Sequence, residues 1–142
     1  MTTGLLQRHM ITLESGPEAS ARASGWARVL AERAGLDEDK TYALDLTIVE
    51  MVTNIVDYSY KGAAGEIRLD LDVGAARAVL TILDRGPAFD PLSVPPPQKP
   101  KSVEEAQVGG FGIHLVRSMS NGCHYERRDG SNVLTVYFGA RG

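Results

Sequence analysis

The stretch DKTYALDLTIVEMVTNIVDY, residues 39–58, decides the fold. It contains neither glycine nor proline, and the acidic run at 37–39 supplies charge that favours a helix N-terminus. Most of its side chains are apolar, so we predict a largely buried helix, the longest in the chain. Three polar residues lie at positions i, i+4 and i+7, namely Glu50, Asn54 and Asp57. They share one face at this spacing, so a polar stripe crosses an otherwise apolar helix.

This polar stripe has two interpretations. A carboxylate and an amide are costly to bury among apolar side chains unless they are paired or coordinated, which favours a stripe that lines a cleft. The alternative is an ordinary helix surface that faces water. The helix alone does not decide between the two.

Shorter elements lie on both sides of the helix, and their apolar periodicity and turn residues identify them. We expect a strand at 8–13, a helix between Gly16 and Gly35, strands at 66–72 and 78–83, a helix at 113–119, and strands at 123–128 and 133–138. Helices interspersed with antiparallel pairs indicate an α/β (α+β) two-layer sandwich. Its sheet is mixed and mainly antiparallel, with the helices on one face.

The segment between Gly86 and Gly112 has a different composition. It holds six of the seven prolines of the chain and shows almost no periodicity. We therefore predict a long loop, with a lid over about 87–109. Loops of this length in compact domains are usually active-site lids, binding loops or disordered linkers.

Composition indicates one domain and limits its partners. With 142 residues, 43% of them hydrophobic, the chain suits a single domain over 1–142. Its 18 acidic and 15 basic residues are spread along the sequence, so no basic face indicates nucleic acid or an anionic membrane. One cysteine, Cys123, excludes an intramolecular disulfide. Neither a signal peptide nor an apolar run of membrane-spanning length is visible, so we expect a cytoplasmic protein.

A second candidate site is the stretch DRGPAFDP, residues 84–91, directly after an apolar strand. A carboxylate at a strand end can accept a hydrogen bond from an exocyclic amine, and a glycine two residues later lets a ring approach closely. The alternative is a turn that ends the strand, since Asp, Gly and Pro are the usual turn residues.

A third candidate is VGGFGIHLVR, residues 108–117, in which glycines open a helix. Free N–H groups and the helix dipole make such a terminus suitable for phosphate, whereas a flexible hinge or an ordinary helix start is the alternative. It is not a Walker loop, since no Gly-Lys-Ser/Thr follows. It is not a dinucleotide fingerprint either, since no strand leads directly into it.

The order of these three segments is more informative than any one of them. The chain resembles the superfamily of gyrase, heat-shock chaperone, histidine-kinase and mismatch-repair ATPases (the GHKL or Bergerat fold). Within it, the chain looks like the anti-sigma-factor serine kinases of bacterial partner-switching systems. The resemblance extends over about residues 11–138 and rests on four motifs: EMVTNIVDYSY at 50–60, DRGPAFDP at 84–91, GGFGIHLVR at 109–117 and DGSNVLTV at 129–136.

This resemblance implies a site for ATP and Mg²⁺. Asn54 would coordinate the metal through its side-chain oxygen, and Glu50, one turn earlier, would be the general base. Asp84 would accept a hydrogen bond from the adenine amine, with support from Thr135. The residues that the resemblance assigns to ATP binding are Asn54, Asp57, Asp84, Gly86, Phe89, Gly109, Gly110, Phe111, Gly112, Ile113 and Thr135.

Two departures from the family pattern concern the phosphates. Many similar kinases have a His shortly after the matched Asn, where this chain has Asp57 and Tyr58. The lid often carries an Arg before the first phosphate glycine, but residues 107–109 are Gln-Val-Gly. Lys99 or Lys101 could substitute for this Arg at the γ-phosphate.

The implied function is an ATP-dependent protein-serine/threonine kinase that also acts as an anti-sigma factor. Its implied partners are a small anti-anti-sigma (STAS-type) protein, as substrate, and a sigma factor or similar regulator, and analogy suggests a homodimer. The alternative is a regulatory module that binds ATP without turnover, which the two departures favour. The catalytic half of a histidine kinase fits less well, because no helical segment with a phosphoacceptor His is present.

Overall fold

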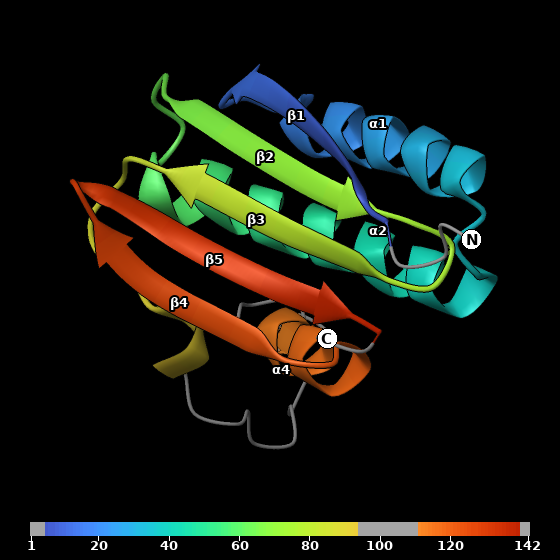
Figure 1. Cartoon of the computed structure of the whole chain (residues 1–142). Helices are drawn as coiled ribbons and strands as arrows, with labels where there is room; N and C mark the ends of the chain where they lie inside the picture. The colour runs from blue at the N-terminus through green and yellow to red at the C-terminus, as the bar shows by residue number, and fades with distance from the viewer. Residues whose placement is uncertain (1–4, 94–110, 140–142) are drawn as a thin grey trace.

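Five strands form one antiparallel sheet in the order β1-β2-β3-β5-β4 (Figure 1). The computed structural model of the chain describes residues 5–93 and 111–139. The strands within these ranges are β1 (Gln7–Glu14), β2 (Glu66–Val73), β3 (Ala78–Asp84), β4 (Cys123–Arg128) and β5 (Ser131–Phe138). The last two are joined at Asp129 and Gly130, which both adopt positive φ, as a tight hairpin turn requires.

Helices cover one face of this sheet (Figure 1). They are α1 (Ala19–Ala34), α2 (Glu38–Asn54) and α4 (Phe111–Met119), with short helical segments at η1 (Ile55–Ser59) and η2 (Pro91–Ser93). The order of the elements and the two-layer α/β sandwich confirm the fold class that the sequence predicts. Every pairing of the described strands is antiparallel, whereas the sequence predicts a mixed, mainly antiparallel sheet. No helix in the described ranges is long and apolar enough to cross a membrane.

The core lies between the two layers and follows from the alternation of side chains along each strand. Alternate residues of β2 point into it and are at most 2% exposed: Ile67, Leu69, Leu71 and Val73. Helix α1 contributes small buried side chains at four-residue spacing: Ala19, Ala23, Ala27 and Ala31. Such spacing puts all four on one face of the helix, and their small size lets α1 lie close to its neighbours.

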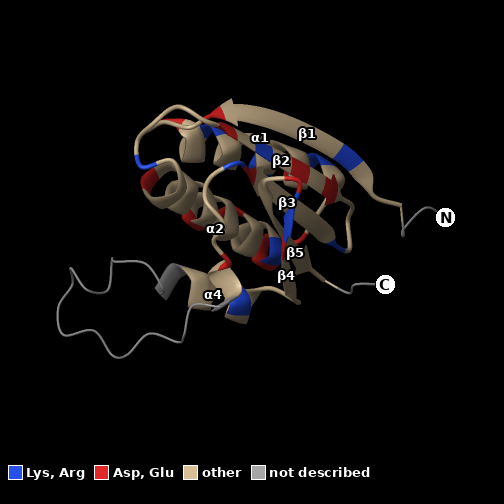
Figure 2. Ribbon diagram, turned by 90° about the vertical axis from the view of Figure 1, so that its left-hand side faces the viewer, with Lys and Arg blue, Asp and Glu red and all other residues tan. Residues whose placement is uncertain are grey.

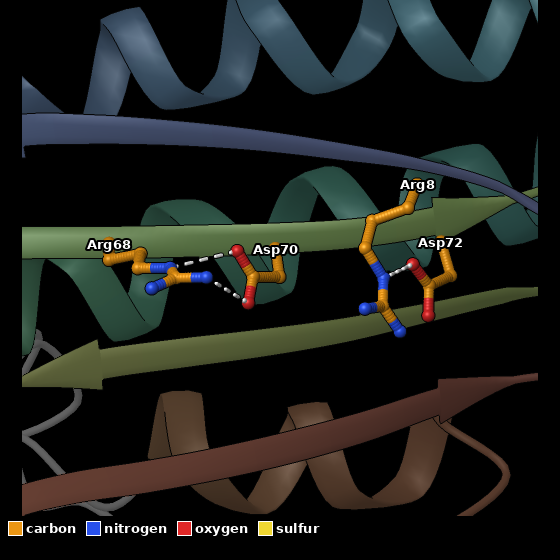
Figure 3. Close-up of polar contacts among 4 residues, drawn as sticks. All are labelled: Arg8, Arg68, Asp70 and Asp72. Atoms are coloured by element: carbon orange, nitrogen blue, oxygen red, sulfur yellow. Dashed lines mark hydrogen bonds and ion pairs between the residues drawn. The ribbon is translucent and has the colours of Figure 1, made fainter.

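The opposite face of the sheet carries charged side chains. Figure 3 shows two ion pairs there, one from Arg8 Nε to Asp72 Oδ1 at 3.0 Å and one from Arg68 Nε to Asp70 Oδ1 at 3.1 Å. The hydrogen bond to Asp72 raises the pKa of the Arg8 guanidinium. Exposed pairs contribute little to stability, so they mark a solvent-facing surface. Charges of both signs are interspersed over the described chain (Figure 2), and no single basic face is visible in that view.

The longest helix changes its geometry near its end. The residues after α2, Ile55–Ser59, form a π-helix, and Tyr60 N–H donates to Ile55 O at 2.9 Å. The predicted helix over 39–58 therefore has nearly the right extent, but the sequence does not reveal the wider turn. Turns of this kind often occur at functional sites, and this one follows directly after Asn54.

Asp37 is the N-cap of α2. Its Oδ1 accepts a hydrogen bond from Lys40 N at 2.8 Å, and its Oδ2 lies 2.7 Å from Lys40 Nζ. The hydrogen bond from the Lys40 side chain lowers the pKa of the Asp37 carboxyl. A carboxyl with a lowered pKa stabilises the fold above its unfolded pKa, and this stabilisation is lost as the pH falls through its folded pKa.

We predict that Asp37→Ala lowers the Tm by a few degrees at pH 7, because the cap is lost. The difference from wild type should disappear as the pH falls below the folded pKa of Asp37. Thermal unfolding followed by circular dichroism at both pH values measures this, with Glu32→Ala, an exposed carboxylate in α1 away from a helix N-terminus, as the control. An unchanged difference at low pH would contradict the role of the charged cap.

Candidate functional site

A pocket lies between the end of α2 and the sheet, with about 430 Å³ of empty space when the solvent at its open mouth is included. Its apolar lining includes Met51, Ile55, Ile82 and Leu134. Its polar lining comprises Asn54, Ser59, Asp84, Tyr125 and Asn132. An apolar pocket with a few convergent polar groups is the usual form of a small-molecule site. The π-helix contributes to the wall, because Ile55 and Ser59 are its first and last residues.

Asp84 ends β3 and is only 6% exposed. Its Oδ1 accepts two hydrogen bonds, from Gly86 N at 2.9 Å and from Asn132 Nδ2 at 3.1 Å. Its Oδ2 accepts none from the described residues. Because a carboxylate offers lone pairs on both oxygens, Oδ2 remains available to accept a hydrogen bond from a ligand.

Gly86 lies where two parts of the chain come very close together. A Cβ at this position would lie 2.7 Å from Ser59 Cβ and 3.0 Å from Asp84 Oδ1, so a larger residue would displace the π-helix or the loop. Arg127 Nη1 donates to the Gly86 carbonyl at 2.8 Å and holds the loop in place. The sequence predicts close approach of a ligand ring at this glycine, and the structure shows close approach of the protein itself.

Tyr60 ties this region to the neighbouring strand. Its hydroxyl donates to Glu66 O at 2.7 Å and accepts from Arg85 N at 2.8 Å. Burial raises the pKa of Tyr60, so the hydroxyl keeps its proton at neutral pH. The contact joins the start of β2 to the residue that follows Asp84.

Asn132 is a buried residue of the pocket to which the sequence assigns no role. It lies directly opposite Asp84 in the pairing of β3 with β5, and it is 5% exposed. Besides Asp84, its side chain contacts Pro87 O, Phe89 N and the Tyr125 hydroxyl. The signal that could reveal it is strand alternation, because Asn132 shares its face of β5 with the buried Leu134 and Val136.

The sequence resemblance implies that Thr135 supports Asp84, but the pairing of β3 with β5 places Thr135 elsewhere. Thr135 lies opposite Thr81, three residues from Asp84 along β3, and it does not line the pocket. Its side chain is on the opposite face of β5 from Leu134 and Asn132, because successive residues of a strand alternate. Asn132 takes the place beside Asp84 that the sequence assigns to Thr135.

Of the three residues in the polar stripe, Glu50, Asn54 and Asp57, only Asn54 lines the pocket. Glu50 is half-buried one turn before Asn54 on the same helix. Neither side chain makes a hydrogen bond within the described ranges. Asp57 lies in the π-helix, is exposed and does not line the pocket.

The predicted phosphate segment is described only from Phe111 onward. Gly109 and Gly110 lie outside the described residues, as do Lys99 and Lys101. Phe111 and Gly112 begin α4, and the Ile113 side chain is buried in the core. The N–H groups of this first turn have no acceptor within the helix, as at any helix start. Phe89 lines the pocket with a side chain that is 48% exposed.

These features fit an adenine nucleotide. The apolar walls suit a flat ring, and Asp84, which lines the pocket, has one carboxylate oxygen, Oδ2, without a hydrogen bond from the described residues. The Asn54 side-chain oxygen is a hard ligand of the kind that Mg²⁺ prefers. In the described ranges no group of three His, Cys, Asp or Glu residues forms a metal site of its own. A magnesium ion here would therefore depend on Asn54 and on ligands outside that set.

The fold and this pocket define the class of the protein. The family described as the histidine kinase-like ATPase domain matches residues 13–138, and the chain belongs to that family. The match confirms the resemblance drawn from the sequence motifs. It also supports ATP as the ligand of the site.

Individual relatives make the class more specific. The chain is 33% identical over 112 residues to the serine/threonine-protein kinase BtrW of Bordetella bronchiseptica, which covers 78% of this chain and 79% of that protein. It is 28% identical over 113 residues to the serine-protein kinase RsbW of Bacillus thuringiensis, which covers 77% of this chain and 71% of that protein. Both names agree with the predicted enzyme class, a protein-serine/threonine kinase.

A solved structure supports the fold. The RsbU and RsbW domains of Rv1364c from Mycobacterium tuberculosis superpose with a TM-score of 0.64 at 16% identity. The match covers 94% of this chain but 32% of that chain, so the present chain corresponds to about a third of the larger protein. At this identity the likeness shows the fold alone.

We predict that Gly86→Ala destabilises the protein by roughly 1–3 kcal/mol, because the added Cβ overlaps Ser59. It should also weaken ATP binding, since the loop beside Asp84 must move. Urea unfolding and calorimetric titration with Mg-ATP measure the two effects. Gly25→Ala in α1 is the matched control, because nothing lies within 4 Å of a Cβ there. Equal behaviour of the two variants would contradict the close packing at Gly86.

A second prediction separates the two faces of β5. Thr135→Val should leave the affinity for Mg-ATP within about twofold, as is usual for substitutions away from a site. Asp84→Asn should weaken it by about tenfold or more, because a hydrogen bond to a charged acceptor is lost. Fluorescent-nucleotide titrations compare the two variants. A loss in Thr135→Val as large as in Asp84→Asn would mean that Thr135 reaches the nucleotide.

Proposed function

We propose that this protein is an ATP-dependent protein-serine/threonine kinase and anti-sigma factor of a partner-switching system. Its substrate is a small anti-anti-sigma (STAS-type) antagonist, and it sequesters a sigma factor or a similar regulator. The observation that supports this best is the position of Glu50 and Asn54. They lie one turn apart on α2, and Asn54 lines the same pocket as Asp84.

Each of these residues has a distinct role in the proposal. Bound Mg-ATP supplies the phosphoryl group that is transferred. Asn54 holds the metal through its side-chain oxygen, and Asp84 accepts from the adenine amine. Glu50 accepts the proton of the serine hydroxyl, for which a carboxylate without a partner in the described chain is suited.

The remaining expected contacts belong to the proposal as well. The N–H groups of Gly109, Gly110, Phe111, Gly112 and Ile113 would bind phosphate oxygens at the start of α4. Phe89 would pack against the base from the rim of the pocket. Asp57 would act through water, because its exposed side chain does not line the pocket. Lys99 or Lys101 would contact the γ-phosphate.

The setting of the protein is also part of the proposal. We place it in the cytoplasm, without direct contact to nucleic acid or membrane, and with a homodimer as its assembly. The edge strand β1 leaves one side without a neighbouring strand in the described chain, which suits pairing with a second copy.

A module that binds ATP without turnover is the second candidate. It is favoured by the absence of an Arg at 107–109, where similar kinases often contact the γ-phosphate. This candidate shares the nucleotide pocket but not phosphotransfer. Binding and transfer must therefore be measured on the same variants.

We predict that wild-type protein transfers phosphate from Mg-ATP to a serine or threonine of its STAS-type antagonist, obtained by co-purification from the native cell. Glu50→Gln should keep ATP affinity but lower the transfer rate by about 10²- to 10⁴-fold, as loss of a general base does. Asn54→Ala should lose Mg²⁺-dependent ATP binding. Radiolabelled transfer and nucleotide titration measure these effects.

The control for these variants is Thr53→Ala on the same helix, which is exposed and does not line the pocket. Binding that requires Asn54, without transfer by wild type to any co-purified antagonist, would reject the kinase and support the binding module. Undiminished transfer by Glu50→Gln would reject Glu50 as the base.

A further inference from the structure

The Asn132 carboxamide is fully occupied by the protein itself. Its Nδ2 donates to Asp84 Oδ1 at 3.1 Å and to Pro87 O at 2.9 Å. Its Oδ1 accepts from Phe89 N at 3.1 Å and from the Tyr125 hydroxyl at 2.6 Å. A carboxamide has two N–H donors and two acceptor lone pairs, so these four contacts use its whole capacity. Asn132 lines the pocket but has no hydrogen bond left for a ligand.

These contacts fix the orientation of Asp84. The last torsion of an aspartate side chain is soft, so a carboxylate with few partners can turn either oxygen toward a ligand. Here Asn132 and Gly86 N both bind the same oxygen, Oδ1. Turning the plane of the carboxylate away from this orientation would break both bonds in a buried environment, where lost hydrogen bonds are costly. Among the described residues, Oδ2 is therefore the oxygen left to accept a hydrogen bond.

Asn132 also holds the loop that follows Asp84. Pro87 O and Phe89 N lie on either side of Ala88, and both bind the same carboxamide. Arg127 and Arg117 add contacts at the two ends of this stretch, to Gly86 O at 2.8 Å and Leu92 O at 3.1 Å. The loop at the mouth of the pocket is therefore attached to β4, β5 and α4.

We propose that Asn132 is a positioning residue that gives the site its preference for a purine with a 6-amino group. It acts through Asp84, by keeping Oδ2 free and correctly oriented, and does not touch the nucleotide. This inference rests on the proposed function, because it takes an adenine nucleotide as the ligand. It assigns base selectivity to a residue of β5 that the sequence motifs leave without a role.

The test compares Mg-ATP with purine riboside 5′-triphosphate, which lacks only the 6-amino group. Wild type should prefer ATP by about 10- to 100-fold, as expected for a hydrogen bond to a charged acceptor. Asn132→Ala and Asn132→Asp should bring this ratio close to one, while affinity for the analogue changes much less. A residue with only a structural role would weaken both nucleotides equally.

Two further variants serve as a milder change of the same network and as a control. Tyr125→Phe removes one of the four contacts and should lower the ratio partially, even where Asn132→Ala fails to fold. Thr81→Val, on the solvent-facing side of β3, should leave the ratio unchanged. In the nucleotide-free protein, hydrogen exchange of the Phe89 amide should be faster in each folded Asn132 variant than in wild type.

The outcomes separate this inference from the proposed function. Wild type that binds neither nucleotide would overturn both. Wild type that prefers ATP, with the same preference in every folded Asn132 and Tyr125 variant, would overturn the inference and leave the proposed function standing. Equal affinity of wild type for the two nucleotides would overturn the inference and the adenine contact that the proposed function assigns to Asp84, and would leave the proposed phosphotransfer standing.

Discussion

The antiparallel register of β3 with β5 determines both the core and the pocket. It sets Leu80 opposite Val136 in the core and, at the end of the strand, Asp84 opposite Asn132. Because side chains alternate between the two faces, a slip by one residue would turn the whole set outward. The apolar residues that fill the core therefore also specify where the polar pair lies, and no separate interaction is needed to place it.

The second constraint is the burial of α2 against this sheet. Ile48 and Val52 are completely buried, so the helix cannot rotate without exposing them, and Asn54 is held at the pocket. The π-helix after Asn54 then brings Ser59 against Gly86. The helix end and the strand end meet at this contact, which only a glycine permits. The packing of α2 against the sheet therefore also positions the residues of the pocket.

The sequence predicts those features of the fold and the site that depend on neighbouring residues, and it misses those that depend on contacts between residues far apart in the chain. Apolar periodicity is local, so it predicts the order of helices and strands, and turn residues mark Asp84 and Gly86. Asn132 is 48 residues from Asp84, and the register that joins them depends on tertiary packing, which a single sequence does not display. Thr135 has suitable chemistry, but alternation with the buried Leu134 and Val136 puts it on the other face. The π-helix has no local signal, because its residues also suit an α-helix.

The two ends of the site differ in how far they are ordered before a ligand binds. At the base end, Asp84 and Asn132 are buried and bonded within the protein, and a satisfied polar network in a low dielectric is rigid. At the other end, Glu50 and Asn54 make no hydrogen bond within the described chain. Under the proposed function, binding near Asp84 needs little reordering, because the side chains of Asp84 and Asn132 are already bonded within the protein. The fold therefore fixes the end of the pocket at Asp84, whereas the roles proposed for Glu50 and Asn54 depend on what binds beside them.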